Sequence, residues 1–285
     1  MPPSFNAARS LQGIKHRAKV LSKSGEAAYM HLLDVESQRA GFSSWKAAQR
    51  FLPTKVFATR ISSPWDQSSA DGFRSLGVET LTFSFRRPVR CMIEDAPATM
   101  LYGWFSAVED GEAKYLGNPF DQADAREKIC HFVRSLMFQE ATGLLPDFGG
   151  TGVWPRGTDG NLSWDITPPG KGRLKYWVHP QTNEKLVTIE RDWIDHFFND
   201  EEMKAWCLKH DYLMTALKWS GITSQKDALD FSLLTRRKSE IDVQSLVAAI
   251  ELLPDDFSPS NWPGTSEISR TAIKPNARPL GDRHD

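Results

Sequence analysis

The cysteines and histidines of this chain are the first residues whose types suggest chemistry. Cys207 and His210 are three residues apart, a spacing that puts two metal-ligand side chains on one helical face. A second pair at a matching spacing does not follow, so the pattern favours a buried apolar role for Cys207 and a helix-terminal role for His210. Weaker candidate ligands surround a later hairpin: His179, Glu190, Asp192 and His196. We predict no metal and no cofactor.

Nucleophilic catalysis requires a thiol or hydroxyl that faces a base. Cys130 and His131 are adjacent, and neighbours on a helix point about 100° apart, so they make a poor dyad. The sequence holds no G-x-S-x-G, and Val-Trp-Pro follows the glycines of 149–152 where a phosphate loop needs Lys, Ser or Thr and a helix. We therefore assign no catalytic residue.

Paired carboxylates could support acid–base chemistry, and the candidate pairs are Asp165 with Glu190, and Asp192 with Asp195–His196. Charged side chains usually stay on the solvated surface, and no spacing distinguishes these ones. If the chain is an enzyme, Glu190, at the end of a predicted strand, is the residue that we place in its site.

Positive charge gathers at the front of the chain. Residues 1–52 hold eight Lys/Arg and three Asp/Glu, a balance of +5, and the whole chain has a net charge of −1, so the remainder carries −6. Seven of these cations fall on predicted helices, the first four on or near one side of the first helix: Lys15, Arg17, Lys19, Lys23, Arg39, Lys46 and Arg50. Such a set can bind phosphates by counterion release, which predicts a DNA- or RNA-binding surface. The alternative is an ordinary solvated face, or a docking platform for a protein.

Three short helices position these cations in a module at 1–52. Apolar residues recur at helical spacing in each of them: Leu11, Ile14, Ala18 and Leu21, then Ala28, Leu32 and Val35, then Trp45, Ala48 and Leu52. Ser43 or Ser44 caps the third helix, and Pro53 stops it. The last two helices loosely match a helix-turn-helix, although Glu36 and Arg50 lie where that motif usually buries apolar side chains.

The clearest element is a central helix at 119–142. One apolar stripe follows a 3.6-residue period: Ile129, Phe132, Val133, Leu136, Met137 and Ala141. We expect a polar opposite side: Arg126, Lys128, His131, Arg134 and Ser135. Asn118 and Pro119 suit its start, and Gly143 suits a left-handed residue after its end. A sheet is expected to pack on this helix.

The remaining segments predict an α+β fold, in which a three-helix module precedes a mostly antiparallel sheet packed with helices. We expect a linker at 53–77, an α+β domain at 78–257, and a disordered tail at 258–285 that has too few apolar residues to fold. Strands are predicted at 81–85, 100–108, 174–178, 185–190 and 228–235, a turn at 109–118, a loop at 148–171, and helices after Asn199 or Asp200 and after Asp242; residues 212–219 fit either strand or helix.

Composition bounds the class of protein. The chain has 285 residues, of which 40% are hydrophobic and 25% charged, as in soluble globular proteins. Its three cysteines are far apart, which argues for reduced thiols. It has neither a signal peptide nor a run of about 18 apolar residues that could span a membrane. We expect a cytoplasmic protein without a membrane partner.

The run from Ile14 to Leu52 resembles a small helical module of plasmid- and phage-borne proteins that also occurs in chains assigned to the glyoxalase superfamily. The matching residues are Ile14, Lys15, Ala18, Lys19, Leu21, Gly41, Phe42, Trp45 and Ala48. Residues 79–89, 134–146 and 154–190 are similar to the rest of one such family, whose function is unknown. The resemblance implies a mobile genetic element as context, and Glu190 lies within its pattern. Glyoxalase metal chemistry does not carry over, because no βαβββ repeat is visible.

Together, these observations predict a non-enzymatic accessory or regulatory protein of a mobile genetic element, which binds nucleic acid through its basic N-terminal module. Two alternatives stay open: a protein-binding inhibitor or adaptor that acts on a host or defence-system protein, and an enzyme with an acidic site near Glu190. The sequence does not distinguish DNA from RNA.

Overall fold

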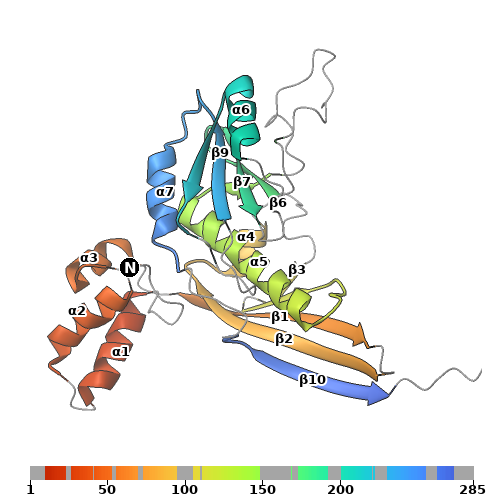
Figure 1. Ribbon diagram of the computed structural model, residues 1–285. Helices are drawn as coiled ribbons and strands as arrows, with labels where there is room; N and C mark the ends of the chain where they lie inside the picture. Colours follow the sequence, from red (N-terminus) through yellow and green to blue (C-terminus); the bar gives the residue numbers. More distant parts are fainter. Residues whose placement is uncertain are drawn as a thin grey trace, which may run out of the picture.

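A computed structural model shows seven helices and two five-stranded sheets (Figure 1), which confirms the α+β class within the part of the chain that it describes. The residues described are 10–23, 27–40, 42–52, 56–69, 73–94, 105–109, 111–147, 168, 173–191, 200–219, 221, 230–254 and 262–272. The helices are α1 (Leu11–Lys23), α2 (Tyr29–Arg39), α3 (Trp45–Phe51), α4 (Val89–Glu94), α5 (Gln122–Thr142), α6 (Asp200–His210) and α7 (Val243–Glu251). The strands are β1 (Phe57–Ser68), β2 (Phe73–Phe85), β3 (Phe105–Glu109), β4 (Glu112–Tyr115), β5 (Leu145–Pro146), β6 (Arg173–Val178), β7 (Lys185–Arg191), β8 (Tyr212–Leu217), β9 (Asp230–Arg236) and β10 (Thr265–Ala272).

The N-terminal helices α1, α2 and α3 form a module with a core of its own (Figure 1). Most of the predicted inward residues meet there: Ile14, Ala18, Leu32 and Ala48 are buried, and Leu33 joins them. Ala28, just before α2, was predicted inward but is exposed. Ser44 caps α3 by accepting a hydrogen bond from the backbone N–H of Ala47 at 3.2 Å. The three helices were therefore predicted correctly, because short amphipathic helices show their apolar period in the sequence.

Sheet A has the strand order β10-β2-β1-β4-β3, with antiparallel pairing throughout except between β1 and β4. The prediction of a linker at 53–77 is wrong for the described residues of that range, because β1 and the first part of β2 occupy them. Strand β1 was not recognised in the sequence because it contains many polar residues and Pro64. Pro64 is tolerated because the β1–β4 ladder ends at Ser62, so at Pro64 the strand pairs with β2 alone. The predicted turn at 109–118 likewise contains β4.

Sheet B has the order β5-β6-β7-β9-β8 and is antiparallel. Its central hairpin, β6–β7, was predicted from the sequence, and residues 212–217, which fitted either strand or helix, form β8. Helix α6 covers one face of this sheet, where Met203 and Trp206 pack on Val187 and Ile189. Helix α7 begins at its predicted cap, Asp242.

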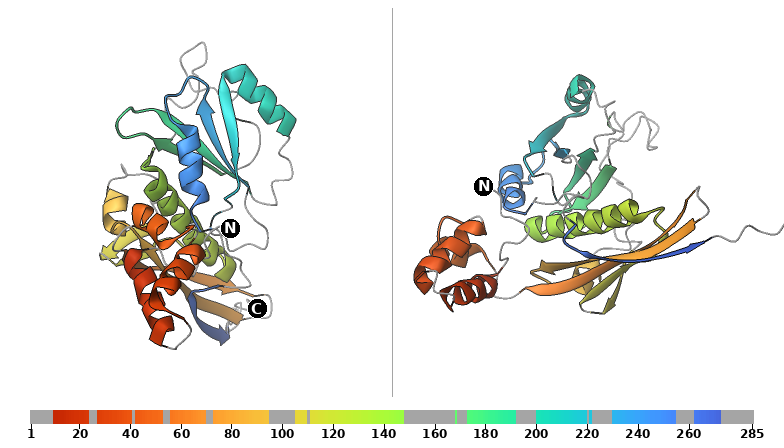
Figure 2. Two further views of the ribbon diagram at one scale, coloured as in Figure 1. Left: turned by 90° about the vertical axis from the view of Figure 1, so that its left-hand side faces the viewer. Right: turned by 60° about the horizontal axis from the view of Figure 1, so that its bottom comes forward.

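Helix α5 joins the two sheets (Figures 1 and 2). It lies along β1 and β2 of sheet A, and Phe138 near its C-terminal end packs on Trp177 of sheet B, with ring centroids 4.3 Å apart. Its N-cap is Asp121 rather than Asn118, because the Asp121 carboxylate accepts a hydrogen bond from the backbone N–H of Asp124 at 2.8 Å. Gly143 follows it at φ 70°, as predicted.

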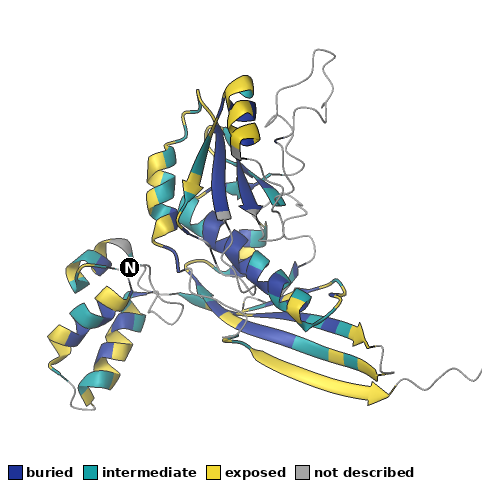
Figure 3. Ribbon diagram, viewed as in Figure 1, coloured by how far each residue is buried: buried dark blue, intermediate teal, exposed yellow. Residues whose placement is uncertain are grey.

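The polar side predicted for α5 is the main correction to the central helix. Arg134 and Ser135 are each 1% exposed, because the second sheet covers the face that a single sheet would leave in solvent (Figure 3). The remaining members of that side, Arg126, Lys128 and His131, are partly buried. Helix α5 is therefore buried nearly all round, and polar side chains on it need partners.

The predicted disorder of 258–285 is wrong for residues 262–272. Strand β10 pairs with β2 along eight residues, from Thr265 opposite Thr80 to Ala272 opposite Phe73. All eight side chains of β10 are exposed (Figure 3), so the strand gives no hydrophobic signal. Backbone pairing holds it, together with Ser266, whose hydroxyl donates to the buried carboxylate of Glu79 at 2.8 Å.

Candidate nucleic-acid interface and a buried charge cluster

The seven predicted nucleic-acid-binding cations are all exposed on the N-terminal module: Lys15, Arg17, Lys19, Lys23, Arg39, Lys46 and Arg50. We call them the cationic surface. The module buries its apolar side chains in its core, and the outer sides of its helices are exposed (Figure 3). Exposed cations can exchange water and counterions for phosphates.

Helix α1 carries the densest part of the cationic surface. Lys15, Lys19 and Lys23 recur every four residues and so form one row along the helix. Arg17 is two residues from both Lys15 and Lys19, and residues two apart do not share a face. We predicted all four on or near one side of the helix; the three lysines share that side, while Arg17 lies on an adjacent flank.

Contacts within the module bring α1 and α3 together. The Lys15 ammonium lies 5.7 Å from the centroid of the Trp45 ring, at the start of α3. Lys46 and Arg50 are exposed on α3 itself. The cations of these two helices consequently belong to one neighbourhood of the module.

Helix α2 contributes a cation that already has a partner. The Arg39 guanidinium pairs with the Glu36 carboxylate at 2.6 Å, and Glu36 is only 1% exposed. The sequence had suggested Glu36 as a departure from the helix-turn-helix pattern, and the residue is indeed buried with its charge paired to Arg39. Arg50, the other departure, faces solvent.

A second group of charges is buried between α5 and sheet B. Arg134 of α5 contacts two carboxylates, Glu127 at 2.9 Å and Glu190 at 3.3 Å. Lys175 of β6 contacts the same Glu190, and its ammonium donates to the Ser135 hydroxyl at 3.0 Å. We call Glu127, Arg134, Lys175 and Glu190 the buried charge cluster. Arg173, which is 40% exposed and 3.6 Å from Glu127, lies at its edge.

Burial and mutual contact set the protonation states in this cluster. Burial raises the pKa of Glu190, but the charges of Lys175 and Arg134 outweigh it and hold that pKa well below its ordinary value. Burial lowers the pKa of Lys175 to about 8, against the opposing effect of Glu190. Near neutral pH, Arg134, Lys175 and Glu190 are therefore charged and mutually paired.

Glu190, the residue that we would have placed in an acidic catalytic site, is thus 1% exposed and engaged by two cations. Such a carboxylate is a poor proton acceptor near neutral pH. Its partners, Arg134 and Lys175, were not predicted from the sequence. The sequence did contain a signal for a buried ion pair. Lys175 and Trp177 are two residues apart in a predicted hairpin strand and so share one face, and a lysine on a buried face needs a counter-charge.

The two cysteine–histidine pairs considered for chemistry lie on two different helices: Cys130 and His131 on α5, and Cys207 and His210 on α6. Cys130 is buried in the core, and burial raises its pKa well above the ordinary value, which makes it a weak nucleophile. Burial, helped by the charge of Lys175, lowers the pKa of the neighbouring His131, so the imidazole is neutral. Cys207 is buried on α6, as expected, and His210 ends that helix beside Trp206.

No three His, Cys, Asp or Glu residues converge to hold a metal ion within the described ranges. Several candidates lie outside those ranges: Asp165, Asp192, Asp195, His196 and the glycines of 149–152. His179, at the end of β6, accepts hydrogen bonds from the backbone of the hairpin turn, including the N–H of Thr182 at 3.2 Å.

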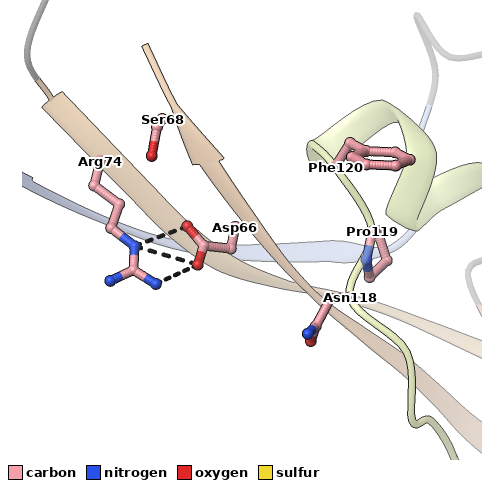
Figure 4. A pocket seen from close by; sticks show the side chains of 6 residues that line it. All are labelled: Asp66, Ser68, Arg74, Asn118, Pro119 and Phe120. Carbon is pink, nitrogen blue, oxygen red and sulfur yellow. Dashed lines mark hydrogen bonds and ion pairs between the residues drawn. The ribbon is translucent and has the colours of Figure 1, made fainter.

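A surface hollow with a volume of about 820 Å³ lies at the end of sheet A where β1 ends and β2 begins. Figure 4 shows a bidentate ion pair between Asp66 of β1 and Arg74 of β2 on one side and the segment Asn118–Phe120 on the other. Phe120 is 84% exposed. The lining therefore combines one paired charge with a solvent-facing aromatic ring.

Comparisons with known proteins add no identity. No family model, no curated protein and no solved structure matches this chain. Among the described helices, none has the length and apolarity that crossing a bilayer requires.

Proposed function

We propose that this chain is an accessory or regulatory protein that binds nucleic acid through the cationic surface of its N-terminal module. The observation that carries the proposal is that all seven cations are exposed on a module with its own small core. Polyanion binding needs positive charge that is accessible and not neutralised by neighbours. The row of Lys15, Lys19 and Lys23 supplies it most directly.

The rest of the molecule explains why the module is favoured for this role. Outside residues 1–52 the chain carries −6, so its net positive charge is confined to the module. The other concentration of cations described above, around Arg134 and Lys175, is buried and paired with Glu127 and Glu190. A mobile genetic element is the setting that the sequence resemblance implies for such a protein.

The proposal is tested by removing matched charges. Lys15→Ala/Lys19→Ala/Lys23→Ala is compared with Lys209→Ala/Lys218→Ala/Lys238→Ala, which removes three exposed lysines from the part of the chain around sheet B. Fluorescence anisotropy with labelled duplex DNA and single-stranded RNA at low salt measures both. We expect the first variant to lose about 10-fold or more in affinity and the second to stay close to wild type. Equal losses in both variants would contradict the proposal.

A protein-binding adaptor is the second candidate function, and the hollow of Figure 4 favours it. Phe120, which lines that hollow, is 84% exposed, and Leu116, two residues before Asn118 in the sequence, is 61% exposed. Exposed aromatic residues are frequent centres of protein interfaces. Co-purification of a host protein that persists at high salt and is lost in Phe120→Ser would support this function.

A further inference from the structure

We infer that the N-terminal module reads duplex DNA, with the outward face of α3 in the major groove. This inference rests on the proposed function and names its ligand class. It starts from the side chains that α3 presents: Lys46, Gln49 and Arg50 are exposed, whereas Ala48 is fully buried. Positions 46, 49 and 50 are three and four residues apart, so the exposed side chains share one face.

The chemistry of this face suits base edges. A glutamine amide can bond both N6 and N7 of adenine, and an arginine guanidinium can bond both O6 and N7 of guanine. Gln49 and Arg50 are neighbours on α3, and Lys46 lies one turn before Arg50. An α-helix with its side chains is about 10–12 Å in diameter, which fits a B-form major groove about 12 Å wide. The seven residues of α3 make it about 10 Å long.

Helix α3 is held rigidly against α2. The backbone N–H of Trp45 donates to the Asp34 carboxylate at 2.8 Å, and the N–H of Phe42 donates to the carbonyl of Ser37 at 2.9 Å. The first bond fixes the start of α3 and the second closes the turn that precedes it. A reading helix needs such fixed placement, because base contacts tolerate little displacement.

The neighbouring helix supplies phosphate contacts. Because Lys15 lies over the Trp45 ring, the lysine row of α1 begins beside the start of α3. In a helix-turn-helix docking, flanking helices bind the backbone while the reading helix enters the groove. Lys15 and its row would hold the phosphates, and Gln49 and Arg50 would distinguish the bases.

Duplex DNA is favoured over single strands and RNA by the same geometry. Single strands are commonly held by open aromatic faces, whereas the Trp45 ring is partly buried and has Lys15 over it. The A-form major groove of duplex RNA is too narrow for a helix. A rigid polar helix face therefore fits B-form DNA best.

The test is a selection from a randomised duplex DNA library with the full-length protein, followed by anisotropy on the enriched sequence. We expect wild type to enrich a short motif with adenine and guanine at fixed positions. Gln49→Ala and Arg50→Ala should each lower the preference for that motif over random duplex by about 10-fold or more. Gln49→Ala should change binding to random duplex little, whereas Arg50→Ala, which removes a member of the cationic surface, should weaken it as well. Arg50→Lys, which keeps the charge, should also lose discrimination at one base.

The outcomes separate this inference from the proposed function. Binding without enrichment, or equal discrimination by wild type and both alanine variants, would overturn the reading role of α3 and leave the binding role intact. Tighter binding to single strands or to duplex RNA would overturn it too. If wild type binds no nucleic acid at low salt, both fall. Circular dichroism of each variant confirms that the helices are retained.

Discussion

The cationic surface and the buried charge cluster use the same residue types in opposite ways. On the module, Lys15, Lys19 and Lys23 face solvent along one helix. Between α5 and sheet B, Arg134 and Lys175 are almost fully buried and each contacts a carboxylate. Exposed pairs and single charges contribute little to stability, whereas buried charges are costly to leave unpaired. The comparison shows that the surroundings of a cation, rather than its residue type, decide whether it is available to bind a partner or forms an ion pair inside the fold.

The largest effect should come from breaking the buried cluster. Glu190→Gln leaves Arg134 and Lys175 without a shared counter-charge in the protein interior. We expect the free energy of unfolding to fall by about 3–5 kcal/mol. Urea denaturation measures this, with Glu251→Gln, which changes an exposed carboxylate, as the matched control. A loss as small as the control's would show that the cluster is hydrated rather than buried.

The pH dependence of stability sharpens the same contrast. Burial lowers the pKa of Lys175 to about 8, against an ordinary value of 10.5. Between these pH values the unfolded chain keeps a proton that the folded chain has released, so the free energy of unfolding rises with pH. Relative to Lys175→Met, the free energy of unfolding of the wild type should therefore rise by about 2–3 kcal/mol between these two pH values.

The measurement is urea denaturation of both proteins at several pH values from 7.5 to about 10.5. Other groups that face Lys175 are Glu190, Arg134, His131 and Arg173, and the pKa values of Glu190 and His131 are lowered, away from this range. Parallel stability profiles for the two proteins would refute the lowered pKa.

A smaller effect is expected at Glu79, a buried carboxylate that links three elements. It accepts hydrogen bonds from Gln122 at 2.9 Å, from Arg126 at 2.8 Å and from Ser266 of β10 at 2.8 Å. Glu79→Gln weakens these charge-assisted bonds and should lower the free energy of unfolding by about 1–3 kcal/mol. Tryptic cleavage after Arg270 should accelerate because β10 then opens more often, and an unchanged cleavage rate would argue against this anchor.

The smallest effect is predicted for an exposed ion pair. Arg90 and Glu94 lie 2.8 Å apart on α4, and both side chains are more than half exposed. Replacing both with Ala should change the free energy of unfolding by no more than about 0.5 kcal/mol. A change as large as that of Glu190→Gln would erase the distinction between exposed and buried charges on which the comparison rests.

The sequence predicted what a helical period or strand alternation can show: the three N-terminal helices, α5, the β6–β7 hairpin and α7. It could not show that a second sheet covers Arg134 and Ser135, because their burial depends on tertiary contacts from residues far along the chain. Strand β10 was missed for a related reason, since it is fixed by backbone pairing with β2 and by the Ser266–Glu79 hydrogen bond, neither of which gives a hydrophobic pattern in the sequence.

Some features of the candidate site could likewise be predicted from the sequence, and others could not. That the basic residues of the module are accessible follows from helix periodicity, and each of them is exposed in the structure. The contact of Lys15 with Trp45 and the partners of Glu190 required three-dimensional placement. Glu190 was selected from the sequence for acid–base chemistry, yet its neighbours hold it as a paired anion.

The most direct test of the central claim is the salt dependence of duplex DNA binding by the full-length protein. We predict that log K falls linearly with log salt, and that Lys15→Ala/Lys19→Ala/Lys23→Ala makes the slope shallower by up to about 3. The lysine triple on the sheet B side should keep the wild-type slope. No detectable binding at about 50 mM salt, or the same slope in all three proteins, would contradict the account.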